Sequence, residues 1–258
     1  MSAHRLRVQR KPFDTLTAAE NAGWARLLRE SATSRWAFLS PTYAEAATIS
    51  LGPVDVLLFW QSDELVGVMP LQRASGWLGR MGMREPVGRH MTDYFGLLAR
   101  PGLQLDWRSL LLKAGVPCLY FTHLDESQSA HGLKGDSPKS GLRTCIHPAG
   151  GEAHWEWLRT RDKKLVSDTE RRERKLVTEH GPLLFEMQST SPVLDLESLV
   201  SLKNAQYRRT GHEGGALLDP ANACLLSRLM ASQDTNCQPR LSVLRCGEQL
   251  VAGHFGLQ

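Results

Sequence analysis

Two pairs of apolar runs, each pair separated by a short polar turn, predict two β-hairpins. Runs of apolar residues at 54–60 and 65–71 enclose a polar turn at 61–64, which is typical of a buried hairpin. A second pair of runs, at 241–245 and 250–257, predicts another hairpin at the end of the sequence. Shorter apolar runs predict strands at 6–8, 94–99, 116–122 and 183–187.

Capping signals and helical spacing predict the helices. Thr17 and Glu20 form a capping-box pattern before apolar residues at helical spacing, and Ser40 before Pro41 indicates a second helix start. Further helices are predicted at 107–113, 155–179, 196–208 and 220–232. Residues 123–153 are rich in Gly, Ser, Pro and His, so we expect a long loop or connector there.

The two predicted hairpins resemble each other. At a constant offset of 185 residues, 56–67 lies over 241–252, and a pair of predicted helices precedes each hairpin. Repeated elements of this kind indicate a duplication, with repeats at 1–145 and 146–258. The alternative is that any buried hairpin with an acidic turn shows the same pattern.

Composition narrows the class of protein. The chain has 258 residues, 41% of them apolar, and its 31 basic and 27 acidic residues give a net charge of +4, too weak to predict DNA binding. Its five cysteines form no CxxC pair and the histidines show no ligand spacing, so we predict no metal site. No apolar run approaches the length of a membrane span and no secretory signal is visible, which predicts a cytoplasmic protein.

Six motifs, taken in order, resemble the GNAT-like acyltransferases of the cellulose-biosynthesis acetyltransferase type, which are distantly similar to Fem-type aminoacyl transferases. They are Trp24 with 38–41, then 65–71, 92–94, 163–176, 207–211 and 248–256. The resemblance covers nearly the full chain, and its specificity lies in the order of the motifs. It implies an α+β fold of tandem GNAT-like mixed sheets flanked by helices, with the second repeat incomplete and the sequence truncated at its C-terminus.

The resemblance also implies a cofactor loop and catalytic residues. The loop after 65–71 carries Arg73, Gly76 and Gly79 where the family holds the pyrophosphate of acyl-CoA, although Leu78 departs from the signature and a Gly-rich turn carrying Trp77 into the core is the alternative. The catalytic candidates, suited to acid–base work, are Asp93, Tyr94 and His254. Each also has a structural interpretation, as a turn cap, a packed ring or a strand histidine.

A cluster of cationic and aromatic residues is the candidate acceptor site. Tyr207, Arg208, Arg209 and His212 end a predicted helix, where the arginines suit a carboxylate, phosphate or sugar acid, or simply the helix dipole. The predicted activity is transfer of an acyl group from acyl-CoA to an amine or hydroxyl, by analogy on a small-molecule or saccharide acceptor in exopolysaccharide biosynthesis.

Two other functions stay open. The first is Fem-type aminoacyl transfer to a cell-wall precursor, in which the basic helix around 159–175 would meet tRNA. Interleaved acidic residues make a solvated helix face the alternative for that helix. The second is an inactive fragment or binding module.

Overall fold

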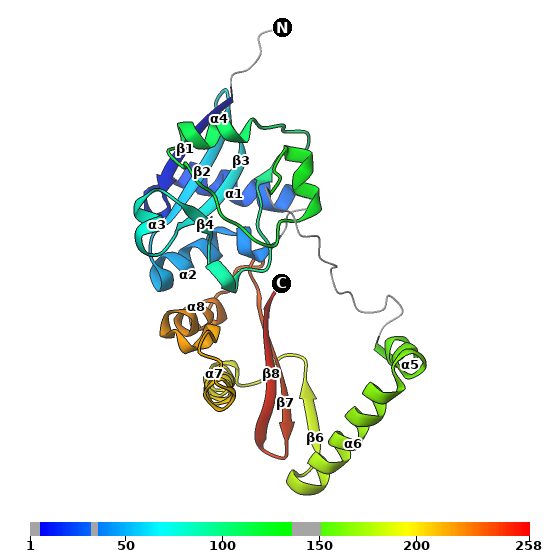
Figure 1. Cartoon of the computed structure of the whole chain (residues 1–258). Coiled ribbons are helices and arrows are strands. Elements are labelled where there is room, and N and C mark those ends of the chain that lie inside the picture. The colour runs from blue at the N-terminus through cyan, green and yellow to red at the C-terminus, as the bar shows by residue number, and fades with distance from the viewer. Residues whose placement is uncertain (1–5, 32–35, 136–150) are drawn as a thin grey trace.

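The computed structural model describes residues 6–31, 36–135 and 151–258, which form two antiparallel sheets flanked by helices (Figure 1). This architecture confirms the predicted α+β class. The N-terminal sheet has helices and loops on both faces. In the C-terminal half, α7 and α8 lie to one side of the sheet, and α5 and α6 extend away on the other.

The N-terminal sheet has the order β1-β2-β3-β4, and β5 also pairs with β3. Its strands are β1 (Leu6–Pro12), β2 (Val54–Gln61), β3 (Glu64–Arg73), β4 (Arg84–Pro86) and β5 (Leu98–Ala99). The helices of this half are η1 (Phe13–Thr15), α1 (Ala18–Glu30), η2 (Ala37–Leu39), α2 (Pro41–Leu51), α3 (Gly76–Arg80), η3 (Arg89–Met91), α4 (Trp107–Lys113) and η4 (Glu126–His131).

The predicted caps explain where α1 and α2 begin. Thr17 Oγ1 accepts a hydrogen bond from the Glu20 backbone N–H, and Glu20 Oε2 accepts one from the Thr17 N–H, so the capping box is complete. Ser40 Oγ accepts from the Tyr43 N–H at 3.0 Å, and Pro41 occupies the first turn of α2. Both predicted helix starts are confirmed.

The N-terminal sheet has a core on each face. On one face Leu58 and Val68 pack with Trp24 of α1 and with α2. On the other face Phe59 and Met69 pack under the chain that follows β5, including α4. Because both faces are covered, the strands of the hairpin are buried along most of their length.

The C-terminal sheet has the order β6-β7-β8, and its hairpin is the second one predicted. Its strands are β6 (Leu183–Glu186), β7 (Pro239–Cys246) and β8 (Gln249–Leu257). The helices of this half are α5 (Gly151–Arg161), α6 (Lys163–His180), α7 (Pro192–Thr210), η5 (Ala216–Leu218) and α8 (Pro220–Met230).

The two hairpins share one register at the predicted offset of 185 residues. Each has a β-bulge at the same point, where Val66 or Val251 is the extra residue. The pairs that flank the bulge are Phe59–Gly67 and Trp60–Leu65 in the first hairpin, and Leu244–Ala252 and Arg245–Leu250 in the second. Each hairpin also follows a strand and two helices, so we propose a duplication. The boundary between repeats 1–145 and 146–258 lies outside the described residues and stays a prediction.

In each half we call the far face the side of the sheet away from the paired helices, which are α1 and α2 in the first half and α7 and α8 in the second. The two halves differ in what covers this face. In the first half that face forms the second core. In the second half the described residues give one core, which contains Leu241, Val243 and Leu250 on the face toward α7. At the offset of 185, Phe59 and Met69 correspond to half-buried Leu244 and exposed His254.

Three element predictions were wrong. Residues 116–122 form no strand, because only single bridges pair Leu119 with Arg84 and Leu124 with Phe95. The strand predicted at 94–99 is confined to β5. The helix predicted at 155–179 is two helices, α5 and α6, because Asp162 leaves the helical conformation and caps α6 by accepting from the Leu165 N–H at 2.9 Å.

Candidate functional site

The predicted phosphate loop lies between β3 and the five-residue helix α3. Gly76 has a left-handed backbone (φ +65°), which a residue with a side chain adopts only with strain. Gly79 is buried, and a Cβ there would lie 1.9 Å from the Ala74 carbonyl oxygen. Arg73 Nε donates to the Gly79 carbonyl at 3.0 Å. The loop is therefore folded tightly onto its own backbone around Gly79.

Trp77 does not enter the core, contrary to the structural alternative for this loop. Its side chain is 70% exposed. The Gly-rich turn instead presents Trp77 to solvent on the surface of α3. Leu78, which breaks the signature spacing, is also exposed.

Asp93 and Tyr94 follow η3 rather than begin a strand. Asp93 is exposed, whereas the Tyr94 ring stacks on Trp36 with centroids 5.1 Å apart. The preceding residue, Thr92, is buried, with its Oγ1 3.0 Å from the Tyr43 hydroxyl. Burial strongly raises the pKa of Tyr43, so this phenol stays protonated near neutral pH. Of this motif, Asp93 is the carboxylate open to an incoming molecule.

His254 lies on the far face of the C-terminal sheet, away from α7 and α8. It is opposite Ser242 in the β7–β8 register and is exposed. A Cβ on Gly256 would lie 3.2 Å from the His254 ring, so glycine leaves room beside the imidazole.

The acceptor candidates gather where α7 ends. The Tyr207 ring lies 5.4 Å from the His212 ring and covers Gly215, where a Cβ would meet it at 2.3 Å. The His212 N–H donates to the Tyr207 carbonyl at 2.9 Å and shapes the turn. Arg208 and Arg209 are exposed beside this pair. The cluster therefore combines an ordered aromatic platform with two accessible cations.

The three groups of predicted site residues lie in different parts of the molecule. The loop at α3 is on the outer side of the N-terminal sheet, and the end of α7 belongs to the C-terminal half (Figure 1). The Asp93 loop and β8 meet at the junction of the halves, where Met91 and Phe255 both pack against the first and third cores. His254 lies on the opposite face of β8 from Phe255, so the structure does not bring its side chain together with Asp93 at this junction.

Two ionisable groups at this junction were missed from the sequence. Burial raises the pKa of Glu85 on β4, although Arg89 and His90 oppose the shift. His90 Nε2 lies 3.3 Å from Asn222 Nδ2 on α8. Arg89 Nε donates to Glu85 Oε1 at 3.0 Å, and a carboxylate whose pKa stays raised beside a cation is a candidate for proton transfer. No pattern in the sequence indicates the contact between His90 and α8, because Asn222 lies 132 positions after His90.

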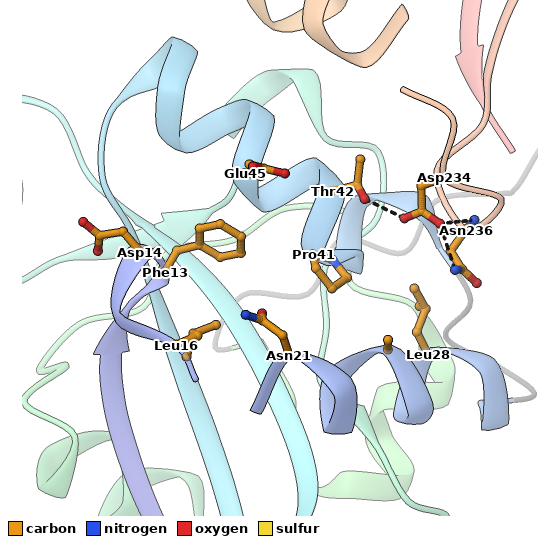
Figure 2. A pocket seen from close by; sticks show the side chains of 11 residues that line it. Phe13, Asp14, Leu16, Asn21, Leu28, Pro41, Thr42, Glu45, Asp234 and Asn236 are labelled. Carbon is orange, nitrogen blue, oxygen red and sulfur yellow. Dashed lines mark hydrogen bonds between the residues drawn. The ribbon is translucent and has the colours of Figure 1, made fainter. Parts of the chain in front are cut away.

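A cavity with a volume of about 500 Å³ opens between η1, α1, the start of α2 and residues 234–236 (Figure 2). Its ionisable lining residues, Asp14, Glu45 and Asp234, are all acidic. Asp234 accepts hydrogen bonds from Thr42 and from the backbone and side chain of Asn236. Burial alone would raise the pKa of Asp234, but these bonds lower it, so it stays ionised. This cavity suits a cation and disfavours the phosphates of acyl-CoA.

Two kinds of feature are absent from the part of the chain that the structure describes. No group of three or more His, Cys, Asp or Glu side chains there is placed to hold a metal ion. None of the helices there is long and apolar enough to cross a bilayer.

Comparison with known families links the C-terminal half to acyl transfer. Residues 163–258 match the model of a family described as acetyltransferase (GNAT) domain, and the match runs from α6 to β8. No curated protein and no solved structure matches the chain. The match supports the GNAT superfamily for this segment, a GNAT-like α+β fold and acyl transfer from acyl-CoA as the general activity.

Proposed function

We propose that the chain is an acyltransferase that moves an acetyl or other acyl group from acyl-CoA to an amine or hydroxyl acceptor. The observation that carries this proposal is the GNAT match over α6 to β8, a segment whose hairpin register recurs in the N-terminal half. In the reaction, the acceptor atom bonds to the thioester carbonyl carbon and the C–S bond breaks. A base takes the acceptor proton, and the thiolate of CoA leaves.

We propose Asp93 and His254 as the proton-transfer residues, with Tyr94 positioned by its stacking on Trp36. Each residue is proposed on its own chemistry, because Phe255 packs into the junction of the halves whereas His254, its neighbour on β8, lies on the opposite face of the sheet. Exposure of Asp93 and His254 leaves both open to an acceptor. The Asp93→Asn and His254→Gln variants are expected to lose acyl transfer while keeping acetyl-CoA binding.

The loop of Arg73, Gly76 and Gly79 is our proposed contact for acyl-CoA. Arg73 ends the buried strand β3 and is an exposed cation three residues before Gly76, which has positive φ. A guanidinium there complements a pyrophosphate. We expect Arg73→Ala to weaken acetyl-CoA binding. Arg108→Ala, a change of an exposed arginine on α4, serves as the matched control and should leave binding intact.

For the acceptor we propose an anionic saccharide held by Tyr207, Arg208, Arg209 and His212. The two exposed guanidinium groups can hold a carboxylate or phosphate, and Lys203, whose Nζ lies 5.2 Å from the Tyr207 ring centroid, adds a third cation beside them. Replacing both arginines by glutamine is expected to raise KM for an acidic sugar acceptor and leave acetyl-CoA binding unchanged. A role in exopolysaccharide biosynthesis and a cytoplasmic location belong to the same proposal.

Calorimetric titration with acetyl-CoA tests the proposed function directly. We expect saturable heat from the whole chain and release of free CoA thiol when an acceptor is added. Absence of heat at millimolar acetyl-CoA contradicts the proposal. Heat without thiol release across amine and hydroxyl acceptors would instead identify a binding module.

One observation favours Fem-type aminoacyl transfer as a second candidate. The basic helix α6 is exposed along its length, with Val166 as its buried residue. Ion pairs such as Arg171–Asp168 neutralise part of its charge. Salt-dependent binding of charged tRNA, together with no response to acetyl-CoA, would favour this function over the first.

A further inference from the structure

The short helix α3 exposes large apolar side chains on the surface of the N-terminal half. Trp77 and Met81 are each 70% exposed and Leu78 is 39% exposed. The Met81 N–H donates to the Trp77 carbonyl, so these two residues lie one helical turn apart on one face. Exposed apolar side chains grouped in this way mark interaction surfaces.

The ionisable residues on α3 and its flanks are cations. Arg73 precedes the helix, Arg80 ends it, and both are exposed. From residue 65 to residue 83 the chain contains no Asp or Glu. We define the α3 patch as Trp77, Leu78, Arg80 and Met81. It combines an aromatic and apolar face with positive charge and no negative charge of its own.

The adjoining chain continues the same character. Pro117 lies against Gly82, where an added Cβ would meet it at 2.9 Å, and the Tyr120 N–H donates to the Arg84 carbonyl. Tyr120 is 52% exposed. Residues 107–122 carry Arg108 and Lys113 and no Asp or Glu. The patch therefore sits in a cationic, aromatic part of the surface.

We propose that the α3 patch docks the protein on the surface of an anionic lipid bilayer. Tryptophan favours the bilayer interface, methionine and leucine gain from leaving water, and arginine attracts anionic headgroups. A helix of five residues can only lie in the interface, in keeping with the absence of a membrane-spanning helix among the described residues. This inference does not depend on the proposed acyl transfer.

A second exposed apolar group gives an internal control. Phe185, Met187, Val193 and Leu194, at β6 and the start of α7, are each at least 59% exposed. The charged residues within 185–197 are all acidic. An anionic bilayer repels acidic side chains. If apolar exposure alone decided membrane binding, this second group would also bind. If complementary charge is needed as well, only the α3 patch binds.

Co-sedimentation with vesicles tests the proposal. The whole chain is expected to bind vesicles of phosphatidylcholine with phosphatidylglycerol, and to bind pure phosphatidylcholine more weakly. The double variant Trp77→Ser, Met81→Ser should lower the bound fraction at least about tenfold, because both apolar anchors are lost. Arg80→Gln should weaken binding and reduce its salt dependence. Met187→Ser, at a side chain of similar exposure in a segment whose charged residues are acidic, should change nothing.

A second measurement locates the contact. Brominated acyl chains should quench part of the tryptophan emission of the unaltered chain, and Trp77→Phe should keep vesicle binding but lose that part. Absence of binding to phosphatidylglycerol vesicles overturns the proposal, as does binding that the double variant leaves intact. A dimer in vesicle-free solution that becomes a monomer in the double variant would also overturn it, because the patch would then be covered by a second copy.

Discussion

A single arginine joins three elements of the C-terminal half. Arg245 on β7 donates from Nε to Glu186 on β6 at 2.9 Å, and from Nη2 to both carboxylate oxygens of Asp195 on α7 at 2.6 and 2.7 Å. Ser189 also donates to Asp195. Burial alone would raise the pKa of Asp195, but these hydrogen bonds and the arginine charge lower it. The carboxylate is therefore ionised when folded, and its charge stabilises the fold.

We predict that Asp195→Asn lowers the free energy of unfolding by about 3 kcal/mol at pH 7, because a buried ion pair loses one partner. A carboxyl whose pKa is lowered by folding stabilises the protein above its unfolded pKa and loses that effect as pH falls through the folded value. The difference between the two proteins should therefore shrink below about pH 4. Urea unfolding across pH measures it. Glu197→Gln, at an exposed position on the same helix, is the control.

The helix before each hairpin begins in the same way. A 3₁₀ turn and a capping residue precede it and a proline is its first residue, with Ser40 and Pro41 at α2 and Asp219 and Pro220 at α8. Asp219 Oδ1 accepts from the Ala221 N–H at 2.9 Å. Ser40 is fully buried, whereas Asp219 is exposed. A capping residue followed by proline therefore starts a helix both in the buried core, at α2, and at the surface, at α8.

We predict that Ser40→Ala costs about 1–2 kcal/mol of stability and Asp219→Ala at most about 1 kcal/mol. A lost cap leaves a backbone donor unpaired, and burial at Ser40 prevents water from replacing it. Chemical denaturation of the two variants gives the comparison. Ser198→Ala, an exposed serine inside α7, should be nearly neutral. Equal costs at both caps would contradict the argument from burial.

Across the whole molecule, one core joins the two halves. Leu225 and Leu229 of α8 and Cys237 belong to the same buried cluster as Trp24 and Val68 of the N-terminal half. Thr42 on α2 also donates to Asp234. Because this cluster takes side chains from both halves, we expect them to unfold together.

We predict that Leu229→Ala lowers the stability of the entire protein by about 2–5 kcal/mol, since Leu229 is 1% exposed and its loss leaves a cavity. Calorimetry should show one transition that moves to lower temperature. Two transitions, of which only one moves, would show that the halves fold independently. Leu112→Ala, at a position 61% exposed on α4, should leave the transition in place.

Sequence by itself determined the local elements. Alternation with polar turns located both hairpins, and the capping signals at Thr17 and Ser40 located two helix starts, because these signals act between residues close in the chain. The apolar run at 116–122 misled because its residues pack as irregular chain against the second core. An apolar run predicts that a segment is buried. Whether the segment also forms a strand depends on a neighbouring strand whose edge is free to hydrogen-bond with it.

Tertiary structure alone decided what meets across the molecule. His90 reaches Asn222, Asp195 reaches Arg245, and Trp77 stays in solvent although its residue type favours burial. Whether a side chain is covered depends on which distant segment packs over it. Local sequence patterns do not predict which segment that is. It depends on how the helices and sheets pack together to bury apolar surface.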